Sequence, residues 1–436
     1  MHAECRFYIT HENRSAPEPR GTQGHPTADR SAAPVLAVLT CNLLIEKLVY
    51  GGEGLSRVDG EVVFTPFVLP GETVEVERTG ARHHVQRARM VRLEQPSPNR
   101  VDARCPQFQS CGGCQYQHAS YDAQLGYKRE ILAETLRRVG KIEFELSRIE
   151  TVAAEPYGYR NRLQFHIENG RIGFRAMHSK RLVAAPQCSV ASPKLNEAIA
   201  TLNRLVRDRA WPEFVKSLEV FTDERHVQWN VMETERPVAK RFFDWVGHEV
   251  PGSVGGPLDY TVGGDKFRVS GGAFFQVNRF LLPQLAALVS GDASGETAWD
   301  LYAGVGLFSL PLARKFRQVL AVESGFSALA DLAVNAERAG LSVMRAGQQV
   351  ETFLMEATEA PDFVVADPPR AGLGAIAAGR LAELHPKRLV IVACDPATLA
   401  RDLAVLLPAY DLERLVLVDL FPQTFHIEAI ACLVAR

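Results

Sequence analysis

Apolar residues in the last third of the chain form short runs that are typical of buried strands, with helical stretches between them. Runs of this kind end at Asp300 and Glu323 and cover residues 363–366 and 388–393. Helical patterns over residues 307–316 and 327–339 follow the first two runs. This alternation predicts a doubly wound, Rossmann-like α/β domain over residues 256–436, with its site at the carboxyl ends of the strands.

A second pattern, short stretches of alternating apolar and polar residues, occupies the region before about residue 95. Glycines and Pro70 separate four such stretches, residues 43–48, 61–65, 72–76 and 88–93. Several short strands at this spacing predict a small closed β-barrel over residues 37–95. Residues 1–36 contain prolines, glycines and scattered polar residues without apolar periodicity, which predicts a disordered tail.

Between these regions, residues 100–255 are predicted to form a central α+β domain. Residues 121–139 carry an apolar stripe at helical spacing. Apolar residues alternate in short stretches between Phe165 and Phe174, as in strands. The glycine-rich residues 252–256 mark the boundary with the last domain.

Composition limits the class of protein. A length of 436 residues with 46 % hydrophobic and 23 % charged residues predicts a globular protein of two to four domains. The chain has no run of about 18 apolar residues and no apolar signal core, so we expect a cytoplasmic protein without a membrane span. Nothing in the sequence requires more than a monomer.

Net charge hides a local imbalance. The formal net charge of −2 argues against a general polyanion binder, but residues 157–181 contain six arginines and lysines and one carboxylate. Clustered positive charge of this kind suits a phosphate footprint, although a solvated surface would look the same.

The turn after Asp300 carries the first candidate site. Residues 300–306 read Asp-Leu-Tyr-Ala-Gly-Val-Gly, and Gly304 and Gly306 let the backbone approach a ligand. Glu323, a carboxylate about 20 residues further on, suits the hydroxyls of a ribose. The order resembles that of S-adenosylmethionine (AdoMet) methyltransferases, while a tight turn or a nicotinamide site would give a similar pattern.

Three thiols lie within ten residues, at Cys105, Cys111 and Cys114. A metal centre needs a fourth ligand, and Cys188 is the only good candidate. Four thiolates suit a [4Fe–4S] cluster or zinc. The bunched spacing lacks the two Cys-x-x-Cys knuckles that are usual for zinc and therefore favours the cluster, with unrelated buried thiols as the remaining alternative.

Three further reactive groups stand at predicted strand ends. Asp367 precedes two prolines that hold the chain rigid. Cys394 ends a strand and precedes a helix, where the pKa of a thiol can be lowered. Glu428 precedes the closing strand. Taken alone, Cys394 would more often be a small buried residue and Glu428 a surface carboxylate.

Together these motifs resemble the RNA uracil-5-methyltransferase family, particularly its iron–sulfur members that act on 23S ribosomal RNA. The resemblance runs from about Leu39 to the C-terminus. Residues 50–54 and 67–72 look like a TRAM domain, whose barrel grips RNA, and the basic residues proposed as phosphate contacts there are Lys47, Arg82 and Arg87.

The resemblance implies a mechanism and a set of site residues. Cys394 would add to C6 of uracil and make C5 nucleophilic, and Glu428 would remove the C5 proton after methylation. The target base would leave its stack, and Phe274 could fill the space. The residues implied to line the AdoMet pocket are Gln276, Tyr302, Gly304, Gly306, Leu307, Glu323, Gln348 and Asp367. The implied cluster ligands are Cys105, Cys111, Cys114 and Cys188.

Two residues depart from the family pattern. Asp395 stands where members usually have asparagine, and an added carboxylate is expected to disfavour the thiolate and raise the pH optimum. Gln348 stands where an acidic residue often meets the adenine amine, so we expect a modest loss of cofactor affinity.

Three other functions remain open from the sequence. One is methylation of the tRNA TΨC-loop uridine, whose bacterial enzymes generally lack the cluster and the barrel. Another is an RNA-binding or assembly factor without activity. A radical AdoMet enzyme would need a close Cys-x-x-x-Cys-x-x-Cys motif that exposes one iron, whereas a fourth ligand at Cys188 favours a closed, structural cluster.

Overall fold

The computed structural model describes residues 40–82 and 85–436, so the tail predicted for residues 1–36 lies outside the described part. The chain divides into two compact units, one up to Arg100 and one over Val101–Arg436. The predicted boundary between residues 255 and 256 stays a prediction. Among the described residues, no helix has the length and apolar character that crossing a membrane requires.

The first unit is a single six-stranded sheet in the order β1-β5-β6-β4-β3-β2. Its strands are β1 (Thr40–Leu44), β2 (Lys47–Leu48), β3 (Glu53–Val58), β4 (Glu61–Pro66), β5 (Thr73–Arg82) and β6 (Val85–Gln95). β3 follows the Gly51–Gly52 turn and is absent from the predicted stretches. Its residues also reach the first strand, because Ser56 Oγ donates to the Leu44 carbonyl over 2.8 Å.

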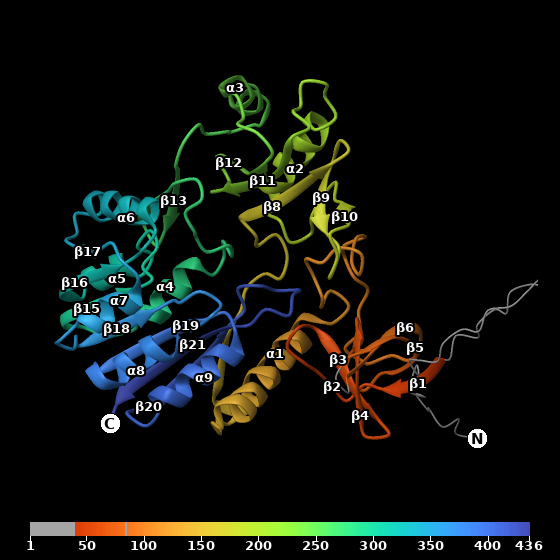
Figure 1. Ribbon diagram of the computed structural model, residues 1–436, viewed down its shortest axis with the longest axis horizontal. Coiled ribbons are helices and arrows are strands. Elements are labelled where there is room, and N and C mark those ends of the chain that lie inside the picture. The colour runs from red at the N-terminus through yellow and green to blue at the C-terminus, as the bar shows by residue number, and fades with distance from the viewer. Residues whose placement is uncertain (1–39, 83–84) are drawn as a thin grey trace, which may run out of the picture. The chain divides into compact units, whose positions relative to one another are not determined.

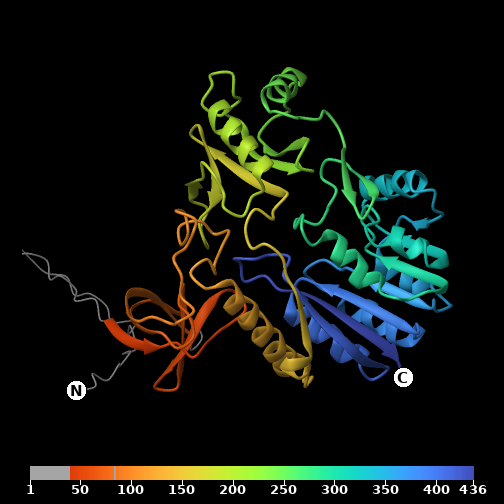
Figure 2. The same ribbon diagram turned by 180° about the vertical axis from the view of Figure 1, so that it is seen from behind.

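The second unit contains a five-stranded sheet and an eight-stranded sheet (Figures 1 and 2). The smaller of them is antiparallel, in the order β10-β9-β8-β11-β12. Its strands are β8 (Arg162–Glu168), β9 (Arg171–Arg175), β10 (Leu182–Ala184), β11 (Val215–Thr222) and β12 (Val227–Thr234). Helices α2 (Pro193–Leu205) and α3 (Lys240–Glu249) contribute Leu202 and Phe242 to its core.

The larger sheet has eight strands in the order β17-β16-β15-β18-β19-β21-β20-β7. The five strands from β17 to β19 are parallel, and β21 runs against both of its neighbours. The strands are β7 (Ile149–Val152), β15 (Gly295–Leu301), β16 (Phe316–Val322), β17 (Met344–Ala346), β18 (Phe363–Ala366), β19 (Arg388–Ala393), β20 (Tyr410–Val418) and β21 (Glu428–Ala435). The prediction of a doubly wound α/β sheet is confirmed.

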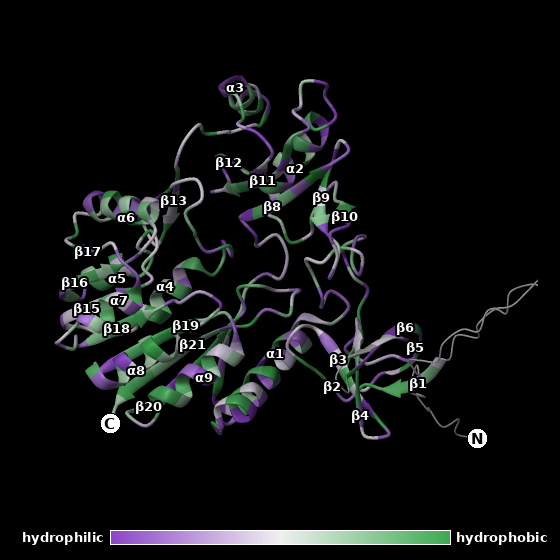
Figure 3. Ribbon diagram, viewed as in Figure 1, coloured by the Kyte–Doolittle hydropathy of each residue, from purple (hydrophilic) through white to green (hydrophobic). Residues whose placement is uncertain are grey.

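Helices connect these strands. They are α4 (Leu282–Ser290), α5 (Ser309–Ala313), α6 (Phe326–Arg338), α7 (Val350–Glu356), α8 (Gly374–Leu384) and α9 (Pro396–Leu406), and the hairpin β13 (Leu258–Val262) with β14 (Asp265–Val269) precedes them. Figure 3 colours the central strands β18, β19 and β21 mostly as hydrophobic, as expected for strands covered on both faces. The helix predicted over residues 307–316 is wrong in length, because Phe316 already begins β16.

The predicted helix over residues 121–139 is confirmed as α1 (Tyr121–Thr135) and the π-helical turn η1 (Leu136–Gly140). The sequence predicts that this helix belongs to a separate central domain, whereas the structure packs it against elements of the predicted last domain. η1 packs against α9 so closely that a Cβ on Gly140 would lie 2.7 Å from the Ala400 carbonyl oxygen. After the 3₁₀ turn η2 (Leu146–Arg148), β7 joins the edge of the large sheet beside β20.

Candidate active site

Cys394, Asp367 and Glu428 meet at one edge of the large sheet. Ala393, the last residue of β19, pairs with Ala429 of β21. Cys394 follows Ala393, and Glu428 precedes Ala429, so the two side chains stand at neighbouring positions of antiparallel strands. Asp367 directly follows β18, the strand on the other side of β19. A thiol and two carboxylates therefore gather where the parallel strands end.

The pKa of the Cys394 thiol is raised, and the expectation of a lowered pKa is wrong. Burial and the carboxylates of Glu428 and Asp367 together raise it to about 11, against a smaller opposing effect of Arg370. The start of a helix alone would favour the thiolate. Here two facing carboxylates and the loss of water outweigh it, so the substrate-free site holds a thiol near neutral pH.

The two carboxyl groups also affect each other. Burial raises the pKa of Asp367 to about 7 despite the opposing effect of the Gln276 amide, which donates to Asp367 Oδ2 over 3.4 Å. Burial raises the pKa of Glu428, which is 3 % exposed, and the charge of Asp367 raises it further. Two nearby buried carboxyl groups resist double ionisation, so the pair retains one proton over part of the neutral range.

Asp395, the departure next to Cys394, acts on the helix that follows. Its Oδ1 accepts hydrogen bonds from the backbone N–H of Ala397 at 2.9 Å and of Thr398 at 3.0 Å. It is thus the N-cap of α9, a position that asparagine fills equally well. The carboxylates that raise the pKa of Cys394 belong to Glu428 and Asp367. We therefore expect Asp395 to affect the pKa of this thiol less than the sequence predicts.

The predicted cofactor turn brings Glu323 beside Gly304. Glu323 Oε2 accepts from the Gly304 N–H over 2.9 Å, and its Oε1 accepts from the Gly325 N–H over 2.5 Å. Gly304 has φ +54° and no atom within 4 Å of where a Cβ would lie. Gly306, at φ +95°, instead packs on α6, because a Cβ there would lie 3.0 Å from Leu332 Cγ.

The remaining predicted cofactor residues lie at the same strand ends. Tyr302 has φ +64°, and its hydroxyl lies 3.5 Å from Glu351 Oε1. Leu307 is buried in the turn that follows. Gln348, half-buried, stands between β17 and α7. The structure brings these positions to one edge, while their contacts with a cofactor stay a prediction.

The sequence predicts Asp300 only as the end of a strand, and the structure gives it a place in the site. It is fully buried, and its Oδ2 accepts from the Ser309 hydroxyl over 2.5 Å. Burial and the charges of Asp367 and Glu323 raise its pKa to about 7, and the hydrogen bond from Ser309 opposes them. The only sequence signal was its position immediately before the glycine turn.

Asn161, directly before β8, and Arg162, its first residue, hold the segment that carries Gln276. Asn161 donates its backbone N–H to the Val277 carbonyl over 3.0 Å and its side-chain amide to the Gln276 carbonyl over 3.3 Å. Arg162 Nη1 donates to the Ala273 carbonyl over 2.7 Å. Phe274, within this segment, is 64 % exposed. The basic residues after Tyr157 thus include structural ones, and do not form one uniform solvated surface.

The four predicted metal ligands line one cavity of about 400 Å³. Cys105 donates its N–H to Gln117 Oε1 over 2.9 Å, and Cys188 donates its N–H to Asn196 Oδ1 over 2.9 Å. Burial raises the pKa of Cys111, Cys114 and Cys188, and neighbouring thiols raise it further. Across residues 40–82 and 85–436, no group of three or more His, Cys, Asp or Glu side chains has the arrangement of a site for one metal ion.

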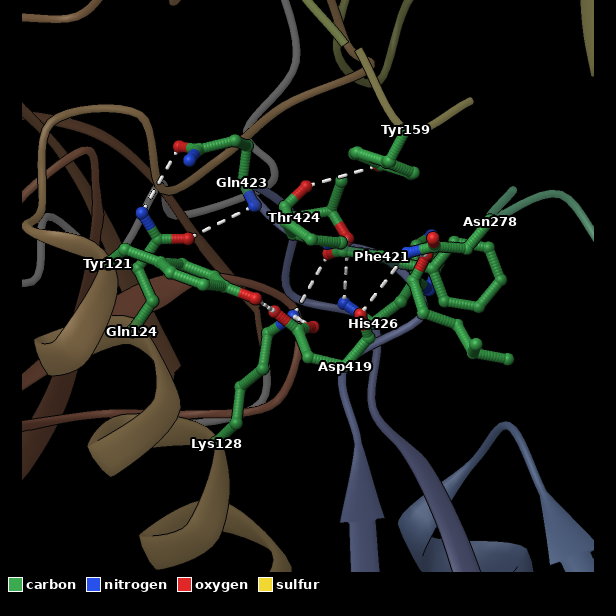
Figure 4. A network of polar contacts seen from close by, with 12 residues as sticks. Tyr121, Gln124, Lys128, Tyr159, Asn278, Asp419, Phe421, Gln423, Thr424 and His426 are labelled. Atoms are coloured by element: carbon green, nitrogen blue, oxygen red, sulfur yellow. Dashed lines mark hydrogen bonds and ion pairs between the residues drawn. The ribbon is translucent and has the colours of Figure 1, made fainter. Parts of the chain in front are cut away.

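The loop before Glu428, residues 419–427, is held by side chains from distant elements (Figure 4). Lys128 of α1 donates to Asp419 Oδ1 over 2.6 Å, and both side chains are fully buried. The side-chain amide of Gln124 donates to Gln423 Oε1 over 3.1 Å and accepts from the Gln423 N–H over 3.0 Å. Sequence reasoning missed these residues; the signal was two polar residues, one turn apart, within the apolar stripe of the helix.

Comparisons with known proteins extend over most of the chain. A family model described as tRNA (Uracil-5-)-methyltransferase matches residues 266–436. An uncharacterized RNA methyltransferase of Aquifex aeolicus is 34 % identical over 90 % of this chain and 97 % of the relative. The 23S rRNA (uracil(1939)-C(5))-methyltransferase RlmD of Pseudomonas putida is 33 % identical over 89 % of this chain and 92 % of the relative.

One solved structure has a similar fold over nearly the whole chain. It is the Pyrococcus abyssi tRNA (uracil-54, C5)-methyltransferase in complex with S-adenosyl-L-homocysteine. It matches with a TM-score of 0.71 and 25 % identity, and covers 90 % of this chain and 100 % of its own. Since the relatives and this structure each cover about nine-tenths of the chain, the likeness reaches well beyond the last sheet.

Proposed function

Because this chain belongs to the RNA uracil-5-methyltransferase family, we propose that it transfers a methyl group from AdoMet to C5 of a uridine in 23S rRNA. Relatives such as that of Pseudomonas putida, which carry this activity in their name, support the choice of RNA. The observation that carries the proposal is the meeting of Cys394 and Glu428 across β19 and β21, with Asp367 beside them.

The proposed reaction uses the thiol and the carboxyl pair in sequence. C5 of uracil is a weak nucleophile, and addition of the Cys394 thiolate to C6 turns C5 into an enolate-like carbon. As C5 forms its bond to the methyl carbon, the sulfonium–methyl bond of a bound AdoMet would break and S-adenosylhomocysteine would leave. Glu428 takes the proton that remains on C5, the C5–C6 double bond returns, and the bond between C6 and the Cys394 sulfur breaks. Because Asp367 and Glu428 resist double ionisation, their proton count affects both the first and the last step.

The strand-end turn fits AdoMet as the methyl donor. The open space over Gly304 and the carboxylate of Glu323 beside it suit a ribose. AdoMet supplies an electrophilic methyl group when bound. The residues that would hold it are those implied by the family pattern, namely Gln276, Tyr302, Gly304, Gly306, Leu307, Glu323, Gln348 and Asp367.

The cysteine cavity fits a [4Fe–4S] cluster. Four thiols face one space, and each would bind a different iron, so their sulfur atoms need not converge as closely as around a single ion. We expect Cys111→Ser to lose iron, measured by absorbance and metal analysis, and to unfold at a lower temperature. An iron-free protein that is as stable as the iron-bound one would contradict a structural role for the cluster.

The first unit is proposed to close as a TRAM-like barrel that contacts RNA. The hydrogen bond from Ser56 to Leu44 brings β3 to the first strand, as closure requires. Of the three basic residues proposed to contact phosphate, Arg87 forms an ion pair with Glu53, and the side chain of Arg82 lies outside the described part. Lys47 lies in β2.

A second candidate, tRNA uridine methylation, is favoured by the description of the matching family model and by the Pyrococcus abyssi structure. Labelled AdoMet with unmodified 23S rRNA and, separately, unmodified tRNA distinguishes the two. We expect label in 5-methyluridine from rRNA alone, and none with Cys394→Ala. Label from tRNA alone would establish the second candidate, and no label from either would indicate an RNA-binding protein without activity.

A further inference from the structure

The base and the nucleophile of the proposed reaction are attached to the sheet in different ways. Cys394 directly follows β19, and only Asp395 separates it from α9. Glu428 begins β21 only after the loop 419–427 has turned back from β20. Glu428 pairs with Val418 of β20 as the first residue of β21, so its orientation depends on that pairing and on the path of the loop before it, which has no helix or strand of its own.

Donors from three other segments satisfy the carbonyl groups at the beginning of this loop. Asn278 Nδ2 donates to the Leu420 carbonyl over 3.1 Å, and Lys128 Nζ donates to the Phe421 carbonyl over 3.0 Å. The Tyr159 hydroxyl donates to the Pro422 carbonyl over 3.1 Å. Consecutive buried carbonyls, each with a partner from another element, fix a loop path that the local sequence does not specify.

Polar side chains of α1 form further buried hydrogen bonds with Asp419 and Gln423 of the loop (Figure 4). Asp419 receives Lys128 Nζ on Oδ1 and the Tyr121 hydroxyl on Oδ2, at 2.6 and 2.9 Å. Gln124 exchanges two hydrogen bonds with Gln423, one with its backbone and one with its side chain. Gln423 has φ +69°, a conformation that a non-glycine residue keeps only when its surroundings impose it.

The same loop is attached to the segment after the last bunched cysteine. The Gln423 carbonyl accepts from the N–H groups of Gln115 and Tyr116, each over 3.0 Å. Gln115 immediately follows Cys114. The strained residue of the loop thus stands between α1 on one side and the cysteine segment on the other.

We propose that Gln124, Lys128 and Tyr121 of α1 are positioning residues for Glu428, which set the loop 419–427 for removal of the C5 proton. The proposal rests on the proposed function, because it concerns one step of that reaction. Charge supports the arrangement: the Lys128 ammonium is neutralised by Asp419 where no water reaches either group. None of the three residues contacts the strands that carry Cys394 in the hydrogen bonds described, so formation of the covalent adduct should be affected little.

The test separates proton removal from the earlier steps. Glu428→Gln should form the methylated adduct between Cys394 and RNA but release it slowly, and it provides the reference. Gln124→Met is close in shape to the native side chain and deletes both hydrogen bonds to Gln423, together with the one to the Ala119 carbonyl. We expect its adduct, measured on a denaturing gel with labelled RNA, to form at nearly the normal rate and to break down up to about 100-fold more slowly.

A milder variant and a matched control secure the interpretation. Tyr121→Phe removes one hydroxyl that donates to Asp419, and we expect a smaller slowing in the same direction. Tyr410→Phe makes the same change at the other end of β20, where a fully buried hydroxyl donates to the Pro386 carbonyl over 3.0 Å. The control should keep the normal ratio of adduct to product, even if its stability falls.

Each outcome bears on one proposal or the other. If Glu428→Gln accumulates adduct but Gln124→Met and Tyr121→Phe keep the wild-type ratio of adduct to product, the positioning role is wrong. If Tyr410→Phe shifts the ratio as much as they do, the effect is general loosening and the role is likewise wrong. If neither the wild type nor Glu428→Gln forms an adduct, the proposed function itself fails.

Discussion

The two reactive groups of this site occupy neighbouring strand ends, yet they are fixed by opposite kinds of interaction. The turn that holds Cys394 is determined by its neighbours in the chain, since Asp395 caps the next helix through N–H groups two and three residues away. The loop that ends at Glu428 is held by α1 residues such as Lys128, 291 residues away in sequence. A strand-to-helix turn can specify itself, whereas a long loop needs partners from elsewhere.

The largest effect is expected from breaking the distant interaction. Lys128→Met leaves the carboxylate of Asp419 buried without its cation, which should lower the free energy of unfolding by about 3–5 kcal/mol. Urea unfolding followed by circular dichroism measures this. The double variant Lys128→Met/Asp419→Leu removes both charges and should recover most of the loss, because an apolar pair of similar volume needs no desolvation of charge.

Lys240→Met is the control for that experiment. Lys240 forms an ion pair with Asp244 on α3, where the two side chains are 87 % and 60 % exposed. Such a pair contributes less than about 1 kcal/mol, so the control should unfold almost like the wild type. A loss for Lys128→Met no larger than for Lys240→Met would show that the loop does not depend on its distant partner.

A second effect concerns the local half of the comparison, the thiol itself. Because burial and two carboxylates raise the pKa of Cys394 to about 11, the thiolate is the minor form at neutral pH. Below that pKa its fraction increases about tenfold per pH unit. Adduct formation in a single turnover should therefore accelerate from pH 6 to pH 9. A rate that is constant across this range would mean that RNA or AdoMet binding has already lowered the pKa.

The smallest effects are expected from Asp395. Asp395→Asn keeps a good N-cap, so stability should change little, whereas Asp395→Ala should cost about 1 kcal/mol. We also expect the pH–rate profile of Asp395→Asn to match that of the wild type, because the carboxylate of Asp395 is engaged in capping. A profile displaced to lower pH would restore the prediction that this residue disfavours the thiolate.

Much of the framework followed from local patterns. Alternation of apolar runs and helical stretches predicted the doubly wound sheet, since buried parallel strands and their crossover helices each leave a periodic signal. The turn at Gly304 and the strand ends at Asp367 and Cys394 could be predicted for the same reason. Short elements were not: β3 has little alternation, and α5 is only five residues long, which is too short for a clear periodicity.

By itself, the sequence determined which chemical groups this protein has at its strand ends, because a strand, a turn and a cap are encoded within a few residues. Only the tertiary structure decided how those groups behave. The pKa of Cys394 depends on carboxylates delivered by two other strands, and the path to Glu428 depends on α1 and its two buried polar side chains. Such effects sum over residues that are close in space and hundreds of positions apart, where no local pattern can record them.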